Sequence, residues 1–188
     1  MTVFLDLIGS WIVRASLIIV MLTLTLNMNN TLYRSNQQSY AKKILTAVDS
    51  IMYSDINEAG YNVSGVTFQT ASSTDMQFLG TLNSPTGANA TVRWYAVWDA
   101  TTRLYTLYRY VNNENGGNPI KMGNTFSTVS FIYYDKNGNT TSTLANIVSV
   151  RVSLVSRYVL TNAFATTKGV TNDTMYVSAN FRIHPVNL

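Results

Sequence analysis

The chain has 188 residues, enough for one ordinary domain with an appended segment but hardly for two full domains. Only 12% of the residues are charged, and the net charge of +4 is spread along the chain without a Lys/Arg run, so nucleic-acid binding is not expected. Cysteine is absent, which excludes disulfides, thiolate metal sites and cysteine nucleophiles.

The first element is an apolar stretch over residues 7–26, about as long as a membrane-spanning helix needs to be. Nothing basic precedes Arg14, whereas Arg34, Lys42 and Lys43 follow the stretch. Taken literally, the positive-inside rule puts the C-terminal side in the cytoplasm. The remainder is rich in Ser, Thr and Asn, which is typical of an exported protein. We therefore expect a mature chain from which a basic leader has been removed.

The helical pattern continues beyond this stretch, because apolar residues recur every three or four positions, as in an amphipathic helix. The predicted apolar face holds Tyr40, Ile44, Val48, Ile51 and Asp55, with Leu45, Met52 and Ile56 beside them. We predict one helix from about residue 3 to about residue 58, ended by Gly60 and roughly 80 Å long. Its first half is apolar almost all round.

After Gly60 the pattern changes to a period of two, which is typical of strands. The β-branched and aromatic runs lie between turn residues and read VTF, MQFLG, TVRWYAVW, RLYTLYRY, FSTVSFIYY, NIVSVRVSLV and MYVSANFRI. Two hairpins are predicted, one from WYAVW-DATT-RLYTLYRY and one from FIYYD-KNGN with the strand that returns after it.

These elements predict an α+β fold, in which the amphipathic half of the helix packs on a mostly antiparallel β-sheet. We divide the chain into three parts. Residues 1–30 are an apolar helical stem, residues 31–60 are the amphipathic continuation of the helix, and residues 61–188 are a β-rich globular head.

Five segments carry a family resemblance through their order and spacing. They are DINEAGY at 55–61, LYR at 107–109, VSFIYYDKNG at 129–138, IVSVRVSLV at 147–155 and FRIHPVNL at 181–188. With the long helix ahead of a β-rich head, they resemble type IV pilins and type II secretion pseudopilins. The head most resembles the minor pilins and pseudopilins called PilW-like or GspJ-like. The likeness covers most of the chain from about residue 44 to the end.

The resemblance implies a structural subunit of a type IV pilus-like extracellular filament or pseudopilus. It also implies three partners: further copies in a helical homo-oligomer, inner-membrane lipid before assembly, and the pilus or type II secretion assembly machinery. The expected location is the cell surface, with a membrane-inserted precursor. The family has Glu at the fifth mature position, and Asp6 takes that place when residues are counted from Thr2. The family's cleavage glycine is not seen, and Arg14 departs from its uncharged stretch.

Asp6 and Arg14 have two interpretations. In the first, Asp6 is a helix-start carboxylate favoured by the macrodipole, and Arg14 reaches toward lipid headgroups. In the second, they serve assembly. Eight residues separate them, about 12 Å along a helix, so a neighbour staggered by that rise places its Arg14 beside this chain's Asp6. Asp6 paired with a neighbour's amino terminus is a variant of the second interpretation that the resemblance implies.

Some aromatic residues are candidates for a surface that binds glycans or other ligands, chiefly Trp94, Trp98 and Tyr108. In a strand Trp94 and Trp98 point to one side and Tyr95 to the other, so they do not all serve one surface. Packing in the helix–sheet core or between heads is the alternative.

No catalytic or metal site is expected. The single histidine, His184, has no acidic residue near it in the sequence, and no Gly-rich phosphate loop, HExxH or GxSxG is present. DKNGN at 135–139 resembles a calcium loop but has no downstream bidentate Glu, and Asn-Gly favours a tight turn. We predict neither a cofactor nor an enzyme.

Two alternatives to a repeating filament subunit stay open. One is a minor tip or priming pseudopilin that starts the fibre. The other is a membrane-anchored surface binding module that keeps the stem as a permanent anchor. Arg14 argues against the anchor, because a lone helix in lipid gains nothing from that charge.

Overall fold

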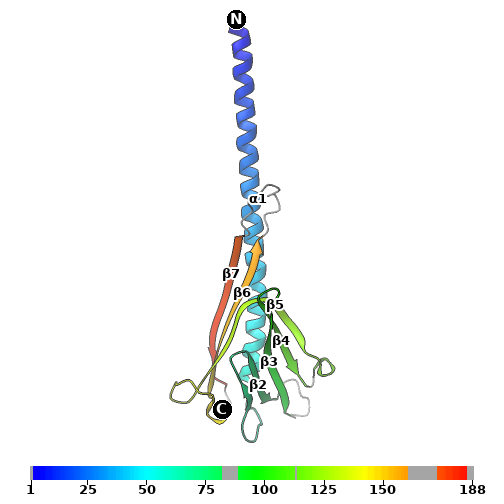
Figure 1. The fold of residues 1–188 in the computed structure, drawn as a ribbon, viewed down its shortest axis with the longest axis vertical. Helices are drawn as coiled ribbons and strands as arrows, with labels where there is room; N and C mark the ends of the chain where they lie inside the picture. Colours follow the sequence, from blue (N-terminus) through cyan, green and yellow to red (C-terminus); the bar gives the residue numbers. More distant parts are fainter. Residues whose placement is uncertain (1, 82–88, 113, 161–172, 186–188) are drawn as a thin grey trace.

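The computed structural model describes residues 2–81, 89–112, 114–160 and 173–185. These residues form one long helix followed by seven strands and two short 3-10 helices. In Figure 1 the N-terminal half of the helix projects from a head that the strands build around its C-terminal half. The predicted α+β fold, a long N-terminal helix packed on an antiparallel sheet, is confirmed.

Helix α1 (Thr2–Asn57) is one continuous helix, close to the predicted span. Gly60 follows its end with a φ of 83°, a left-handed conformation that glycine adopts without a steric penalty. The Gly60 amide donates a hydrogen bond to the carbonyl of Leu79 at 2.9 Å. The chain therefore passes directly from the end of the helix onto the sheet.

The buried face of α1 differs in part from the predicted one. Its apolar members are Ala41, Leu45, Val48, Met52 and Ile56. Tyr40 and Ile51, both predicted on the buried face, are 60% and 38% exposed. Apolar residues occupy two adjacent helix faces here, so their spacing alone did not distinguish the face that meets the sheet.

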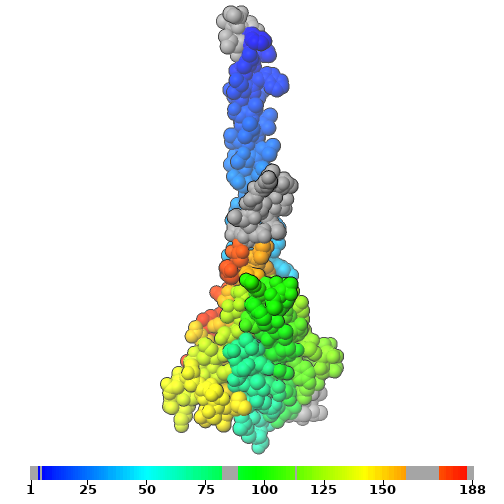
Figure 2. All heavy atoms as spheres, viewed as in Figure 1, coloured from blue at the N-terminus to red at the C-terminus, as the bar shows by residue number. Residues whose placement is uncertain are grey.

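The sheet is an antiparallel meander in which each strand pairs with the next along the chain. Its strands are β1 (Phe68–Ala71), β2 (Asp75–Gly80), β3 (Ala90–Asp99), β4 (Leu104–Val111), β5 (Ile120–Tyr134), β6 (Ser149–Leu160) and β7 (Asp173–Ile183). Each predicted run overlaps one strand, although β1 begins only at the last residue of VTF. Helix α1 lies along β6 and β7 (Figure 1), and the space-filling view in Figure 2 shows the head widening away from the projecting half.

Both predicted hairpins occur, but the second has a longer connection. In the DKNGN turn the Asp135 amide donates to the carbonyl of Asn139 at 2.9 Å, and the Asp135 carboxylate accepts the amides of Asn137 and Asn139. Gly138 has a φ of 81°, as a tight turn requires. The return strand β6 begins only at Ser149, after the 3-10 helix η2 (Leu144–Asn146).

The core lies between α1 and the inward side of the sheet, where alternate strand residues are buried. On β3 these are Ala90, Val92 and Trp94, and on β4 they are Leu107, Arg109 and Val111. Arg109 is the exception to an otherwise apolar pattern, since a charged residue is rarely buried unless it is paired. One of its two partners, Asp55, lies on the helix.

Gly80, at the end of β2, predicts a stability effect. A Cβ added at Gly80 would lie 2.8 Å from the carbonyl oxygen of Glu58, a backbone atom that has little freedom to move. We expect Gly80→Ala to lower the free energy of unfolding by about 1–3 kcal/mol, as overpacking does. The measurement is denaturant unfolding of the full chain in detergent. Gly9→Ala is the control, because a Cβ there meets nothing within 4 Å. Equal stability of the two variants would contradict the close approach at Gly80.

Candidate functional site

The projecting half of α1 presents apolar side chains on all its sides. Phe4 and Trp11 are 71% and 70% exposed, and the exposed set continues along the helix with Leu7, Ile12, Leu17, Ile18, Met21, Leu22, Leu24 and Met28. By length and composition this helix is able to cross a membrane, and none of its most apolar window is buried inside the chain. So much exposed apolar surface is unusual for a protein in water and marks a region that contacts lipid or other protein.

Four hydroxyl groups along this part of α1 are hydrogen-bonded within the helix. Ser16 donates to the carbonyl of Ile12 at 2.9 Å, and Thr23 donates to that of Ile19 at 2.8 Å. Thr25 and Thr31 make the same bond to the carbonyl four residues earlier. These bonds hide the hydroxyls from their surroundings, which suits an apolar medium where an unpaired polar group is costly.

Asp6 and Arg14 are the charged residues of this half, and both are exposed. No ion pair joins them within the described part of the chain, in keeping with an axial separation of about 12 Å. The side chain of Thr2, the third residue expected to serve assembly, lies outside the described residues. Among the described residues neither charge takes part in an ion pair.

A buried ionic cluster joins the other half of α1 to the sheet, and we call it the joint. It consists of Asp55 on α1, Trp94 on β3, Arg109 on β4 and Glu114 after β4. Arg109 binds the Asp55 carboxylate in a bidentate manner, with Nε 2.6 Å from Oδ2 and Nη2 2.9 Å from Oδ1. Trp94 Nε1 donates to Asp55 Oδ2 at 2.8 Å, and Arg109 Nη1 donates to Glu114.

The electrostatics of the joint keep Arg109 charged. Hydrogen bonds to the Asp55 carboxylate, followed by those to Glu114, raise the pKa of the Arg109 guanidinium although burial acts the other way. Asp55 is only 2% exposed, so its charge depends on Arg109 and Trp94 for compensation. The joint thus fixes the end of α1 to two central strands and has the character of a structural connection.

The sequence analysis named the segments that contain both residues of this ion pair, but it did not predict that the two residues pair. Asp55 opens the segment DINEAGY and Arg109 closes LYR, and both segments carried the resemblance. One signal was available: Arg109 occupies an inward position in the alternation of β4, where an unpaired charge is not tolerated. Pairing across 54 residues, however, depends on the packing of α1 on the sheet.

The structure separates the three aromatic residues proposed for ligand binding. Trp94 is fully buried and bonded to Asp55, so its assignment to a binding surface was wrong. Trp98 lies on the same side of β3 but is 48% exposed, with its ring 4.8 Å from that of Tyr105. Tyr108 stacks on Tyr95 on the opposite side of the sheet, with centroids 5.2 Å apart. They do not form one surface.

His184 is exposed, just after the end of β7. Among the described residues no cluster of three or more His, Asp and Glu side chains is arranged to hold a metal ion. Asp135, in the loop that resembles a calcium site, uses its carboxylate for the turn amides of Asn137 and Asn139.

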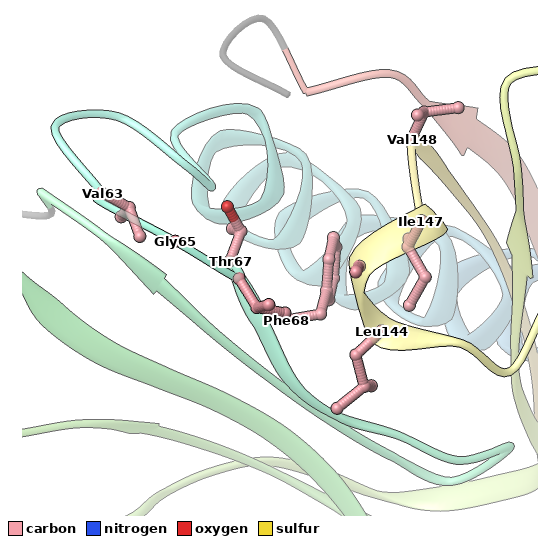
Figure 3. Close-up of a pocket in the computed structure, with 9 residues that line it drawn as sticks. Val63, Gly65, Thr67, Phe68, Leu144, Ile147 and Val148 are labelled. Carbon is pink, nitrogen blue, oxygen red and sulfur yellow. The ribbon is translucent and has the colours of Figure 1, made fainter.

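Figure 3 shows a pocket of about 280 Å³ at the end of the head, between the segment that follows α1 and the segment around η2. Side chains of Val63, Thr67, Phe68, Leu144 and Ile147 line it, with Phe68 almost completely buried. None of its lining residues is titratable, so they supply no acid–base pair.

Comparisons of the sequence with known proteins found no similar protein. No family model matches this sequence, and no curated protein matches it.

Proposed function

We propose that this chain is a structural subunit of a type IV pilus-like extracellular filament or pseudopilus. The observation that carries the proposal is the projecting half of α1, which is apolar on all sides and continues without a break into the half that is packed into the head. A helix of this kind inserts in the inner membrane before assembly and packs against other copies afterwards, with the heads outside. The resemblance quoted above supports the same function.

The membrane and the core of a filament are both apolar surroundings for the stem. In lipid and in a bundle of apolar helices, each polar group needs a partner from the protein. The hydroxyls of Ser16, Thr23, Thr25 and Thr31 meet this demand within one chain. The charges of Asp6 and Arg14 have no ion-pair partner in the described part of the chain, and in the proposed filament a neighbouring copy supplies one to each.

In the proposed filament, Arg14 of one copy pairs with Asp6 of a neighbour that is shifted along the fibre axis by about 12 Å. Breaking a buried pair costs about 3–5 kcal/mol, so a wrong shift between stems is penalised at every contact. The apolar surfaces of two stems can pack at several axial shifts, and the ion pair selects one of these shifts. This gives the two charges a common role.

The experiment is electron microscopy of material sheared from the producing cells, with this chain identified by mass spectrometry. We expect filaments whose main component is this chain. Traces of it in filaments made of another protein would instead support the tip or priming role. Its absence from any filament, with the chain retained in the membrane, would favour the anchored binding module.

Substitutions test the pair in the same assay. We expect Asp6→Ala and Arg14→Ala each to reduce filament yield at least about tenfold, since each leaves a charge unpaired. Ser10→Ala, an exposed uncharged position between them, is the matched control and should assemble normally. The exchanged variant Asp6→Arg with Arg14→Asp should recover part of the yield. Normal filaments from both single variants, with equal membrane levels of the chain, would refute the pair.

A further inference from the structure

The outward side of the sheet, opposite α1, carries a hollow that the proposed function does not use. It has a volume of about 540 Å³, within the range of small-molecule sites. It lies over β2, β3 and β4 and is lined by Gln77, Thr91, Arg93, Tyr95, Tyr110, Asn112 and Pro119. Its walls are polar and aromatic side chains that the strand registers place side by side.

The register explains this arrangement. Gln77 lies opposite Arg93, and Arg93 lies opposite Tyr110, so these three form one row across the strands. Thr91 and Asn112 form the next row, because the Thr91 amide donates to Asn112 Oδ1 at 3.0 Å and the Asn112 amide donates to the carbonyl of Thr91. The floor of the hollow is thus built on paired strands, and Asn112 and Pro119, in the connection between β4 and β5, complete its rim.

The charge within the hollow is neutralised. Arg93 Nε lies 2.9 Å from Asp75 Oδ1, and Nη2 of the same guanidinium bonds Oδ2. The guanidinium carbon lies 4.9 Å from the centre of the Tyr95 ring, whose ring also stacks on Tyr108. Arg93 is therefore held in place and compensated, and an anionic ligand gains little from it.

Three groups that line the hollow make no hydrogen bond to other described residues and are therefore able to bind a ligand. The Tyr110 side chain makes no hydrogen bond and no ring contact within the described part of the chain. Gln77 uses its amide nitrogen on Gln69, which leaves its oxygen as an acceptor. Asn112 uses its oxygen on Thr91, which leaves its amide nitrogen as a donor. An aromatic ring, a free acceptor and a free donor thus line one hollow whose single charged lining residue, Arg93, is neutralised by Asp75.

We propose that this hollow binds an uncharged saccharide. The C–H face of a pyranose ring packs on an aromatic ring such as Tyr110, beside Pro119, while its hydroxyls both donate and accept hydrogen bonds. The Gln77 side-chain oxygen accepts a hydrogen bond from a sugar hydroxyl, and the Asn112 amide nitrogen donates one to a sugar hydroxyl. This inference is independent of filament assembly, because the hollow faces away from α1.

The experiment is a glycan array of neutral and acidic di- and trisaccharides, probed with the full chain. The chain is kept in lauryldimethylamine oxide, since maltoside detergents carry a sugar that would compete. We expect binding to neutral glycans. Titration of the strongest neutral glycan should show an affinity lower by about tenfold or more for Tyr110→Ala. Tyr176→Ala, an exposed tyrosine on β7, is the matched control and should bind as the unaltered chain does.

Three results would overturn the proposal. One is no binding to any neutral glycan, and another is binding confined to acidic glycans. The third is binding that Trp98→Ala removes and Tyr110→Ala leaves intact, which would place the site on the other side of the sheet. Equal thermal unfolding of Tyr110→Ala and the unaltered chain shows that a loss of binding is not a loss of fold.

Discussion

Arg109→Met is expected to lower the free energy of unfolding by about 3–5 kcal/mol, since it leaves the Asp55 carboxylate buried without its counter-ion. Methionine keeps much of the length and apolar volume of the arginine, so the effect reports the lost charge and hydrogen bonds rather than a large cavity. The measurement is denaturant unfolding of the full chain in detergent, followed by the fluorescence of its tryptophans. Trp94 lies within the joint itself and reports the event directly.

Arg93→Met is the matched control, because Arg93 also binds a carboxylate in a bidentate manner, that of Asp75. The Arg93 side chain is 43% exposed, against 10% for Arg109, so water screens and replaces the lost contact. We expect a cost of about 0–1 kcal/mol. Equal costs for Arg93→Met and Arg109→Met would show that burial of the joint does not govern its contribution.

A double variant separates the unpaired charge from other causes. When Asp55→Leu is added to Arg109→Met, no carboxylate remains at this position, so the double variant should be more stable than Arg109→Met alone. The hydrogen bonds from Trp94 to Asp55 and from Arg109 to Glu114 are then lost, and recovery is expected to be incomplete. A double variant that is less stable than Arg109→Met would point to packing of the arginine side chain as the dominant effect.

The second large effect is expected at Met52, on the buried face of α1. Met52 has no exposed surface and belongs to the core between the helix and the sheet. Met52→Ala removes buried volume and leaves a cavity that the head fills only in part, so we expect a loss of about 2–5 kcal/mol. The same unfolding measurement applies.

Ile51→Ala is the control, because the two residues are neighbours on one helix and lose a similar side chain. Ile51 is 38% exposed, and its truncation should cost about 1 kcal/mol or less. This pair also tests which face of α1 packs on the sheet. The predicted face contained Ile51, so a larger loss at Ile51 than at Met52 would restore the sequence-based assignment.

The joint connects the two parts of the proposed mechanism. A stem held in a fibre transmits force to its head through α1, and Asp55 lies only two residues before the end of that helix. Its bonds to Trp94 and Arg109 reach two central strands at once. Together with the buried Ile56 beside it, this cluster is well placed to keep stem and head in one orientation.

Local patterns in the sequence were sufficient for the existence and order of the elements. The apolar run and its helical continuation predicted α1 to within one or two residues, and Gly60 gave its end. Alternation with a period of two located the seven strands, and Asn-Gly located the turn after β5. These features depend on backbone preferences and on residues close together in the chain, which is why sequence reasoning found them.

Only the tertiary structure decided which side chains these elements bury and which they bring together. Tyr40 and Ile51 fit the helical spacing as well as Ala41 and Met52 do, and the position of the sheet selected the second pair. Trp94 and Trp98 share one side of β3, yet Trp94 is covered and Trp98 is half exposed. The physical reason is the same throughout: burial and ion pairing depend on the surface opposite, and distant parts of the chain supply that surface.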